Sequence, residues 1–516
     1  MRVIKPLIAA LGLSLSFTVM ADTQVSVDTT KPGPVINKNI YSQFAEHLGR
    51  GIYEGIWVGP KSKTPNTKGW RNDVVGALKD LQVPLVRWPG GCFADEYHWR
   101  EGIGPRDKRP VKVNTTWGGV LEDNAVGTHE FFDLVEMLGA EAYINGNLGT
   151  GSARDMAEWM EYMTAEGESS LAQLRRKNGR DKPFRVHYFA IGNEAWGCGG
   201  NMTPEFYTHL YKQYATFIKA PADNQPLMIA SGGHSEDTSW ADHLTAHVKP
   251  GGVRMDAVSF HYYTLPTGNW SKKGAALKFP ESEWMSTMVN TLKMDGFIIN
   301  NKKVMDKNDP EKKVGFYVDE WGTWYDVTGD DDPGFLYQQN SLRDAIVAGL
   351  NFNIFHKHAD RVHMSIIAQM VNVLQAMILT EKDKMILTPT YHVFKMYVPF
   401  QDATSLPIEL KNVPQYTLGN ASIPAVSATA ARAKDGKVYI ALVNANPNKA
   451  ETVDINLAGI TVKGVSGQVL TAAAMDAHNT FAAPETIKPA AYSAKAKNGK
   501  LALEIPAKAV VVVAVE

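Results

Sequence analysis

Two glutamates follow short apolar runs, at positions where a purely structural residue would be apolar or a small turn former. Glu194 comes after His187–Gly192, and Glu320 comes after Val314–Val318. Either one alone fits an ion-pair partner equally well. Two carboxyl groups that face one cleft are the equipment for glycoside hydrolysis, because one gives a proton to the leaving oxygen while the other attacks the anomeric carbon. Glu194 and Glu320 are therefore the predicted catalytic residues.

Other apolar runs end in polar or aromatic residues in the same way. The residues concerned are Glu46, Arg87, Asn145, His261, Tyr263 and Gln369. Arg87 carries a charge that would hold one of the two carboxylates ionised. A structural ion pair is the alternative for Arg87, and the sequence leaves both open.

Eight apolar runs alternate with amphipathic stretches between residues 39 and 388. In one stretch Val74, Ala77, Leu78 and Leu81 follow the i, i+3, i+4, i+7 spacing of a helix. Strands that alternate with helices pair in parallel through crossovers, so the pattern predicts an α/β fold, a (β/α)₈ TIM barrel. An open doubly wound sheet is the competing topology. The strands are expected at Ile40–Phe44, Pro84–Trp88, Ala142–Gly146, His187–Gly192, Leu227–Ser231, Ala257–Tyr262, Val314–Val318 and Val362–Ile367.

The pattern changes at residue 389, after which turn residues separate short β-rich runs. Residues 389–516 are therefore predicted to form a second, all-β sandwich domain. Its strands are expected at Val438–Asn444, Thr452–Leu457, Gly467–Thr471 and Leu501–Glu516. In the segment 22–38, Gln24–Asp28 alternates like a strand. We expect it to pair with the sandwich; closing the bottom of the barrel is the alternative.

Residues 1–21 have the composition of a secretory signal peptide. Arg2 and Lys5 precede a run from Pro6 to Met20 that is almost wholly apolar or small. The run is shorter than the ~20 residues of a membrane span, and no later run is as apolar. The sequence therefore predicts an exported protein, periplasmic or secreted, with no membrane span after cleavage.

Charge and cysteine content narrow the function further. The 516 residues include 53 Lys and Arg against 54 Asp and Glu. This balance argues against a nucleic-acid partner, because a general binder needs many basic residues to displace counterions from phosphates. Cys92 and Cys198 are the two cysteines, and each lies in a Gly-rich motif. Two cysteines make no disulfide framework, and the sequence does not decide whether they pair.

The motifs around these residues resemble one family of retaining (β/α)₈ glycosidases, glycoside hydrolase family 51. The resemblance spans most of residues 24–516, and that family consists chiefly of α-L-arabinofuranosidases. Several long motifs in the same order argue against chance. The motifs are Phe44-Ala-Glu-His-Leu-Gly49, Ile52-Tyr-Glu-Gly55, Arg87-Trp-Pro-Gly-Gly91, Ile191-Gly-Asn-Glu194, Trp196-Gly-Cys-Gly-Gly-Asn201 and Asp319-Glu-Trp321.

The resemblance implies a role for each matching residue. Glu194 resembles the general acid/base, Glu320 the nucleophile and Asn193 the partner of the sugar 2-hydroxyl. Glu46 resembles the carboxylate that holds sugar hydroxyls deep in the pocket. The shell that positions the nucleophile is implied to be Arg87, His261 and Tyr263. Pocket walls or further sugar contacts are implied for Cys92, Trp117, Trp324 and Gln369.

The family implies an exo-acting enzyme that releases terminal α-L-arabinofuranosyl residues, with retention, from arabinan, arabinoxylan or derived oligosaccharides. An endo-acting β-glycanase of the same clan is one alternative. A non-catalytic carbohydrate-binding barrel is another, although a binder has no need for a proton donor facing a nucleophile. No cofactor is expected. A homo-oligomer, a hexamer by family resemblance, is expected.

Two groups of residues carry side chains that can bind metals but lack the spacing of a known metal motif. His356, His358 and His363, with Asp360, lack the spacing of a zinc-binding helix pair. The three aspartates at 330–332 lack the Gly and the distant Glu of an EF-hand loop. The prediction for both is a structural or solvated role, with no metal site.

Overall fold

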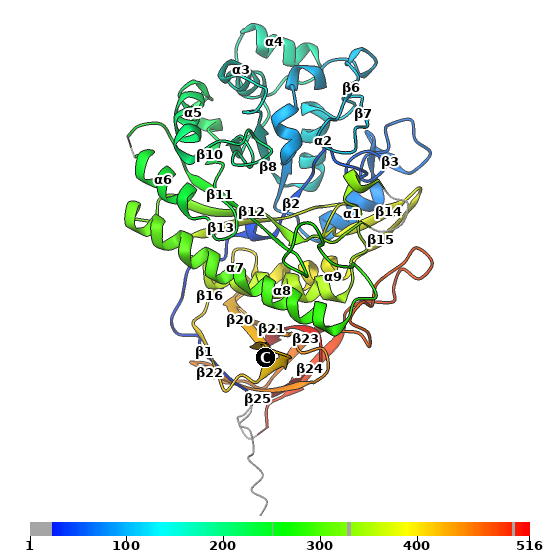
Figure 1. Ribbon diagram of the computed structural model, residues 1–516, viewed down its shortest axis with the longest axis vertical. Helices are drawn as coiled ribbons and strands as arrows, with labels where there is room; N and C mark the ends of the chain where they lie inside the picture. The colour runs from blue at the N-terminus through cyan, green and yellow to red at the C-terminus, as the bar shows by residue number, and fades with distance from the viewer. Residues whose placement is uncertain (1–22, 250, 328–331, 498–500) are drawn as a thin grey trace, which may run out of the picture.

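The structure is a computed structural model that describes residues 23–249, 251–327, 332–497 and 501–516. The segment 1–21, expected to be a signal peptide, lies outside these described residues. Figure 1 shows two parts, a barrel surrounded by helices and a smaller region of strands that contains the C-terminus.

Eight parallel strands close into a barrel, which confirms the predicted (β/α)₈ fold and excludes the open sheet. Each strand pairs in parallel with the next along the chain, and β13 pairs with β2 to close the ring. The strands are β2 (Ser42–Phe44), β5 (Leu85–Trp88), β8 (Glu141–Gly146), β9 (Tyr188–Ile191), β10 (Leu227–Ala230), β11 (Ala257–Thr264), β12 (Gly315–Thr323) and β13 (Val362–Ile367).

Each barrel strand is followed by a helix of the outer layer, and α4 (Ser170–Lys177) is an addition after α3. Polar side chains cap the starts of two of these helices. The Ser152 side chain accepts a hydrogen bond at the start of α3, and the Thr203 side chain accepts one at the start of α5, before Pro204 in the first turn. The helices are α1 (Asn72–Asp80), α2 (Thr128–Leu138), α3 (Ala153–Thr164), α5 (Pro204–Phe217), α6 (Ser239–His247), α7 (Glu281–Asn308), α8 (Leu342–Lys357) and α9 (Pro389–Tyr397).

Helix α9 corrects the predicted start of the all-β domain. The expected boundary at residue 389 falls on the first residue of this helix, which supplies the helix after β13. Pro389 is favourable there because the first turn of a helix needs no backbone N–H, and the Thr388 side chain caps the Tyr391 amide. After α9, the strands of the C-terminal sandwich begin with β16 (Thr404–Ser405).

Two sheets build the sandwich. One has the order β17-β1-β22-β25 and the other the order β16-β20-β21-β26-β23-β24. β1 (Thr23–Asp28) lies near the start of the described chain. It nevertheless pairs with β17 and β22, which come from the C-terminal part of the sequence. The other strands are β17 (Ile408–Lys411), β20 (Val426–Arg432), β21 (Val438–Asn444), β22 (Glu451–Ala458), β23 (Gly464–Leu470), β24 (Ala490–Lys495), β25 (Leu501–Ile505) and β26 (Ala509–Val515).

The single strand expected at Leu501–Glu516 is two strands in different sheets. A turn at residues 506–508 separates β25 from β26, and Lys508 has a left-handed φ of 44° that breaks the extended chain. Short two-stranded ribbons complete the fold: β3 (Asn66–Thr67) with β4 (Trp70–Arg71), β6 (Lys112–Val113) with β7 (Leu121–Glu122), β14 (Ile378–Glu381) with β15 (Lys384–Leu387), and β18 (Gln415–Leu418) with β19 (Ala421–Pro424).

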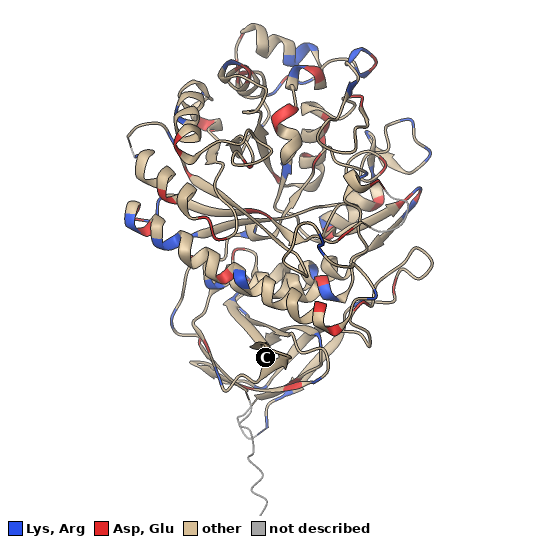
Figure 2. Cartoon of the chain, in the orientation of Figure 1, with Lys and Arg blue, Asp and Glu red and all other residues tan. Residues whose placement is uncertain are grey.

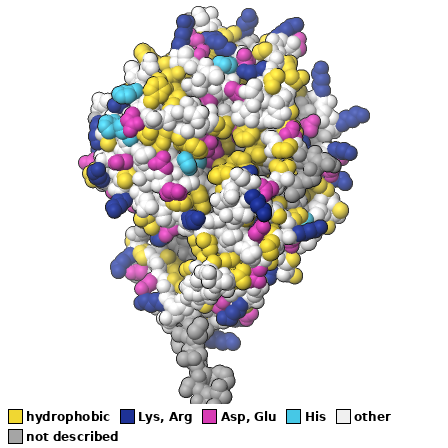
Figure 3. All heavy atoms as spheres, viewed as in Figure 1, with side chains coloured by type: hydrophobic (Ala, Val, Ile, Leu, Met, Phe, Trp, Pro, Cys, Tyr) yellow, Lys and Arg dark blue, Asp and Glu magenta, His cyan; other side chains and the backbone are white. Residues whose placement is uncertain are grey.

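Helix α8 joins the two parts, because it is buried between the barrel and the six-stranded sheet. Gly349 makes the close approach possible: a Cβ at this position would lie 2.9 Å from a methyl group of Val443. Lys and Arg are interspersed with Asp and Glu along the helices (Figure 2). The face in Figure 3 likewise mixes charged side chains of both signs with hydrophobic groups. Among the described residues, none of the helices has the length and apolarity needed to cross a membrane.

Candidate active site

Glu320 lies on β12 and is almost fully buried at the C-terminal end of the barrel. Its Oε1 accepts a hydrogen bond from Arg87 Nη1 at 2.7 Å, and its Oε2 accepts one from the Tyr263 hydroxyl at 2.8 Å. A register shift between β11 and β12 sets His261 opposite Glu320, with Nδ1 3.4 Å from Oε2. Burial raises the pKa of Glu320, and the positive charges of His261 and Arg87 oppose that rise.

Arg87 is the buried cation that links three strand ends. Besides Glu320, it donates from Nη2 to Asn193 Oδ1 at 2.6 Å and to Asn145 Oδ1 at 3.1 Å. Its guanidinium also lies 4.5 Å from the centre of the Phe44 ring. Because its N–H groups donate to both Glu320 and Asn193, Arg87 fixes these two side chains relative to each other.

His261 stands between the two predicted catalytic carboxylates. Nδ1 is 2.8 Å from Glu194 Oε1, and Nε2 is 3.1 Å from Asp319 Oδ1. Burial lowers the pKa of His261, but Glu320 and Asp319 outweigh this effect and raise it to about 10. The ring is then an imidazolium, which donates one N–H to Glu194 and the other to Asp319.

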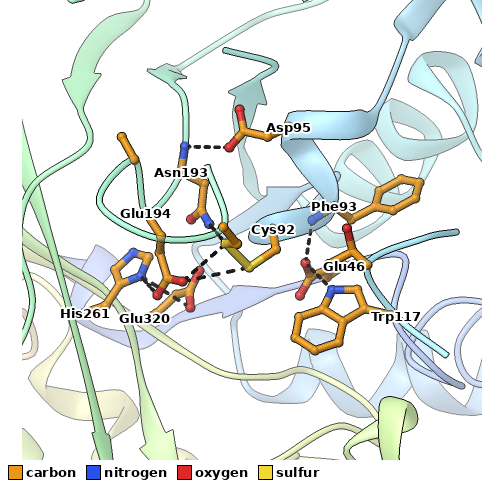
Figure 4. Close-up of a disulfide and its surroundings, with 12 residues drawn as sticks. Glu46, Cys92, Phe93, Asp95, Trp117, Asn193, Glu194, His261 and Glu320 are labelled. Atoms are coloured by element: carbon orange, nitrogen blue, oxygen red, sulfur yellow. Dashed lines mark hydrogen bonds and ion pairs between the residues drawn. A yellow bond between two sulfur atoms is a disulfide. The ribbon is translucent and has the colours of Figure 1, made fainter. Parts of the chain in front are cut away.

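Glu194 comes from the end of β9 and lies at the rim of the site (Figure 4). Its left-handed φ of 41° turns the chain away from the strand direction. Its side chain is 16% exposed, against 6% for Glu320. One carboxylate oxygen of each glutamate lies within 4.8 Å of the other. A closest oxygen pair at this distance agrees with the short carboxyl spacing of a retaining glycosidase rather than the longer spacing of an inverting one.

Glu46 follows β2 and is buried close enough to Glu320 for the two charges to repel, and we call Glu46 and its hydrogen-bond partners the floor of the site. Its Oε1 accepts hydrogen bonds from the Phe93 amide at 3.1 Å and from Trp117 Nε1 at 3.0 Å, and its Oε2 accepts one from Gln369 Nε2 at 2.8 Å. Burial, with repulsion from Glu320, raises the pKa of Glu46 to about 7. Gly91 admits this carboxylate, because a Cβ there would lie 2.8 Å from Oε1.

Cys92 and Cys198 form a disulfide, a pairing that the sequence alone left open. The bond ties the segment after β5 to the loop after β9, beside Glu194 (Figure 4). Cys198 Sγ is 3.4 Å from Glu194 Oε2, and Cys92 Sγ is 3.8 Å from the same atom.

A cavity of about 680 Å³ opens outward from Glu194 and His261. Trp324 lines it, with its ring edge-on to Tyr263 at 5.0 Å between centroids. Trp324 thus lies next to the site. Other lining side chains supply flat faces and charges: Trp196, Glu236, Asp237, Tyr262, Trp270, Lys293 and Phe297.

Two protein-family models match the chain. The α-L-arabinofuranosidase 1 domain matches residues 77–276, and the α-L-arabinofuranosidase C-terminal domain matches residues 319–509. An intracellular exo-α-L-arabinofuranosidase of Bacteroides ovatus is 48% identical over 98% of this chain and 97% of its own length. The chain belongs to glycoside hydrolase family 51.

Solved family 51 structures have the same architecture. The arabinofuranosidase from Xanthomonas axonopodis pv. citri superimposes with a TM-score of 0.94 at 50% identity, covering 96% of this chain and all of that one. The α-L-arabinofuranosidase from Thermotoga petrophila gives 0.84 at 30% identity over the same share of both chains.

The family 51 comparison contradicts the predicted export. The Bacteroides ovatus relative, which matches nearly the whole chain, is named an intracellular enzyme. The prediction of a periplasmic or secreted protein is therefore wrong on this finding. It rested on the basic start, the apolar run and the small residues Val19 and Ala21 before the expected cleavage point.

Sequence reasoning assigned no role to several residues of this family 51 site. Asp319 accepts from Tyr143 and His261, although strand alternation places it and Glu320 on opposite faces. The register shifts where β12 pairs with β13 bring Asp319 and Glu320 into one hydrogen-bond network. Asp95 accepts from the amides of Leu148, Gly149 and Asn193, so it ties three loops together. Burial raises the pKa of Asp95 to about 7.

His356, His358 and Asp360 each contact neighbouring side chains of the protein. His356 contacts the Tyr41 hydroxyl at 2.6 Å, and His358 pairs with Asp295 at 2.7 Å. Asp360 pairs with Lys302 at 2.6 Å, and the same Nζ lies 3.3 Å from His358 Nδ1. Residues 330 and 331 of the aspartate run lie outside the described part of the chain.

Proposed function

We propose that this chain is an exo-acting α-L-arabinofuranosidase that works by double displacement, with Glu320 as nucleophile and Glu194 as acid/base. The observation that carries the proposal is the pair of carboxylates within 4.8 Å, one compensated by cations inside the barrel and the other open to a cavity. The family and the exo-acting relative support the same activity.

In the first step Glu320 attacks the anomeric carbon while Glu194 gives its proton to the departing oxygen. The carbon–oxygen bond breaks, the leaving sugar departs as an alcohol, and an arabinosyl ester forms on Glu320. Arg87 and Tyr263 hold the attacking carboxylate at 2.7 and 2.8 Å, which fixes its orientation.

In the second step Glu194 takes a proton from water, which attacks the same carbon from the face that the leaving group occupied. The ester bond breaks and Glu320 is regenerated. Two inversions give net retention. His261 donates to Glu194 at 2.8 Å throughout, and so keeps the acid/base carboxyl aimed at that face.

The floor around Glu46 supports an exo mode of action. Phe93 and Trp117 fix one oxygen of Glu46, and Gln369 fixes the other. A carboxylate held in this way accepts hydrogen bonds from sugar hydroxyls with little loss of side-chain entropy. A polymer whose terminal sugar is held at this buried carboxylate would enter by its terminal residue.

The cavity beside Glu194 supports binding of the leaving part of arabinan, arabinoxylan or an oligosaccharide. Trp270 is 55% exposed on its wall, and an exposed indole next to charged residues suits sugar faces and hydroxyls. Trp270→Ala should reduce kcat/KM on polymer and leave an aryl arabinofuranoside nearly unaffected. Phe217→Ala is the matched control, because Phe217 is 57% exposed and lies outside the cavity lining.

The oligomeric state is proposed from family resemblance as a hexamer. The β6–β7 ribbon offers an apolar surface for such contacts, since Val111, Val113 and Leu121 are all exposed. Light scattering coupled to size-exclusion chromatography measures the mass directly, and a monomeric mass contradicts the proposal.

Proton NMR during hydrolysis of an aryl α-L-arabinofuranoside tests the activity and its stereochemistry together. The first-formed sugar should be the α-anomer. A first-formed β-anomer contradicts double displacement, and the absence of hydrolysis contradicts the enzyme assignment. Release of internal fragments from a β-glycan, with no arabinose, would favour the endo-acting alternative.

A further inference from the structure

A disulfide lies against the carboxyl group to which proton transfer is assigned above. Cys198 Sγ and Cys92 Sγ approach Glu194 Oε2 at 3.4 and 3.8 Å. Because the two sulfurs are bonded to each other, neither carries a hydrogen, and each offers only lone pairs. A hydrogen bond across this contact therefore needs the proton on Glu194. The sulfurs lie beside the carboxyl in Figure 4.

The other groups facing Glu194 act on its second oxygen or from a distance. His261 of β11 donates to Oε1 at 2.8 Å, and Glu320 of β12 lies across the site. Tyr263 of β11 donates its hydrogen bond to Glu320. His234 follows β10 and lines the same cavity as Glu194. Burial lowers the pKa of His234, so this ring favours the neutral form. Among the described residues, the disulfide sulfurs are thus the atoms placed against Glu194 Oε2.

We propose that the Cys92–Cys198 disulfide supports acid catalysis by withholding a hydrogen-bond donor from Glu194 Oε2, and that its reduction to two thiols weakens proton transfer from Glu194. The oxidised pair can only accept a hydrogen bond, whereas two thiols can donate one to Oε2. A donated hydrogen bond favours a carboxylate over the acid that the first step needs. The proposal rests on the role of Glu194 in the proposed function.

Reduction is chemically accessible at this position. Cys198 is exposed and Cys92 is half-buried. A thiolate of a dithiol reagent attacks Sγ of Cys198, the sulfur–sulfur bond breaks, and the second thiol of the reagent closes a disulfide of its own. The reagent thereby supplies two electrons and two protons, and each cysteine leaves the reaction as a thiol.

The loop that carries Cys198 has backbone support independent of the disulfide. The amides of Gly197 and Gly199 donate to the Glu194 carbonyl at 2.7 and 3.1 Å, and the amide of Met202 donates to the Ala195 carbonyl at 2.7 Å. Breaking the disulfide therefore changes what the sulfurs can donate while these bonds keep Glu194 in place.

The test compares four forms of the full chain: oxidised, reduced by a dithiol, the Cys92→Ser/Cys198→Ser variant and the Cys92→Ala/Cys198→Ala variant. Serine keeps a donor without a cross-link, and alanine removes both. Each form is assayed on an arabinose disaccharide, whose leaving group needs a proton, and on a nitrophenyl arabinofuranoside, whose leaving group does not. The ratio of the two kcat/KM values cancels any loss of folded enzyme.

The reduced form and the serine variant should lose about tenfold in this ratio, part of the ~10²–10⁴-fold that general acid catalysis contributes, and the alanine variant should keep the oxidised ratio. Reoxidation should restore the reduced form, and a dithiol should leave the alanine variant unchanged. An equal fall in all three altered forms shows that only the cross-link matters and overturns the proposal, as does no change on reduction. An oxidised form inactive on both substrates overturns the proposed function itself.

Discussion

The inner wall of the pocket and its rim place a carboxylate in opposite surroundings. On the wall, Glu320 is 6% exposed and contacts Arg87 and Tyr263 at short range. On the rim, Glu194 is 16% exposed and lies between His261 and the disulfide. A nucleophile must keep its charge and its aim, whereas an acid/base must exchange a proton with water in every cycle. The difference in burial and partners fits the proposed roles, Glu320 as nucleophile and Glu194 as acid/base.

The floor supplies a third environment that sharpens the comparison. The hydrogen-bond donors to Glu46 are neutral groups, Phe93, Trp117 and Gln369, and burial raises its pKa to about 7. Glu46 is therefore suited to hold a substrate rather than to react with it. Glu320, Glu194 and Glu46 carry the same functional group at one end of the barrel. The charge of the groups around each carboxylate is what distinguishes them.

The largest effect should follow loss of the wall carboxylate. Glu320→Gln keeps the shape of the side chain and removes the attacking charge, so kcat should fall by about 10⁴-fold or more on every arabinofuranoside. The measurement is steady-state hydrolysis of substrates with good and poor leaving groups. A fall confined to poor leaving groups would assign Glu320 to the rim role instead.

Loss of the rim carboxylate should discriminate between leaving groups. Glu194→Ala should cost about 10²–10⁴-fold on a disaccharide and far less in forming the glycosyl-enzyme from a nitrophenyl glycoside, which departs without a proton. Rapid-mixing kinetics on the nitrophenyl substrate should show a burst followed by slow turnover. Equal losses on both substrates would mean that Glu194 is not the acid.

The floor should affect binding and rate together. Hydrogen bonds to a charged group contribute about 1.5–3 kcal/mol, so Glu46→Gln should lower kcat/KM about 10–100-fold. Steady-state kinetics on an aryl arabinofuranoside measure both constants. Unchanged kcat and KM would remove Glu46 from the substrate site.

His261 should make folding stability depend on pH at the alkaline end. Its pKa rises from the ordinary value of 6.5 to about 10 on folding, so its contribution is complete below the unfolded pKa and is lost as pH rises through about 10. Urea unfolding should show His261→Gln destabilised by roughly a few kcal/mol near pH 6, a gap that closes toward pH 10. A gap independent of pH would mean that His261 is neutral in the folded state.

The smallest effect is expected from Asp95, which supports the rim without touching it. Asp95→Ala leaves buried amides of Leu148, Gly149 and Asn193 without their acceptor, at a cost of about 1–3 kcal/mol. Unfolding by urea measures it. Asp107→Ala is the control, because Asp107 is exposed and makes only a distant pair with Lys108. Equal stability of both variants contradicts the role of Asp95.

The sequence allowed the barrel and its two glutamates to be predicted because local signals carry them. Apolar runs mark the strands, and Glu194 and Glu320 follow them where a structural residue would differ. The Asp319 and Asp95 contacts were not predictable in this way. They depend on register shifts and on loops meeting across the barrel, which periodicity does not encode. Pairing of Cys92 with Cys198 likewise depends on two loops 106 residues apart in sequence.

The proposed roles of Glu320 as nucleophile on the wall and Glu194 as acid/base on the rim are tested most directly by locating the covalent intermediate. Glu194→Ala, mixed with a nitrophenyl arabinofuranoside and quenched with acid, should accumulate the arabinosyl-enzyme, because the base of the second step is missing. Peptide mass spectrometry should find the arabinosyl group on Glu320. An arabinosyl group on Glu46 or another carboxylate, or product release without any covalent species, would contradict the account.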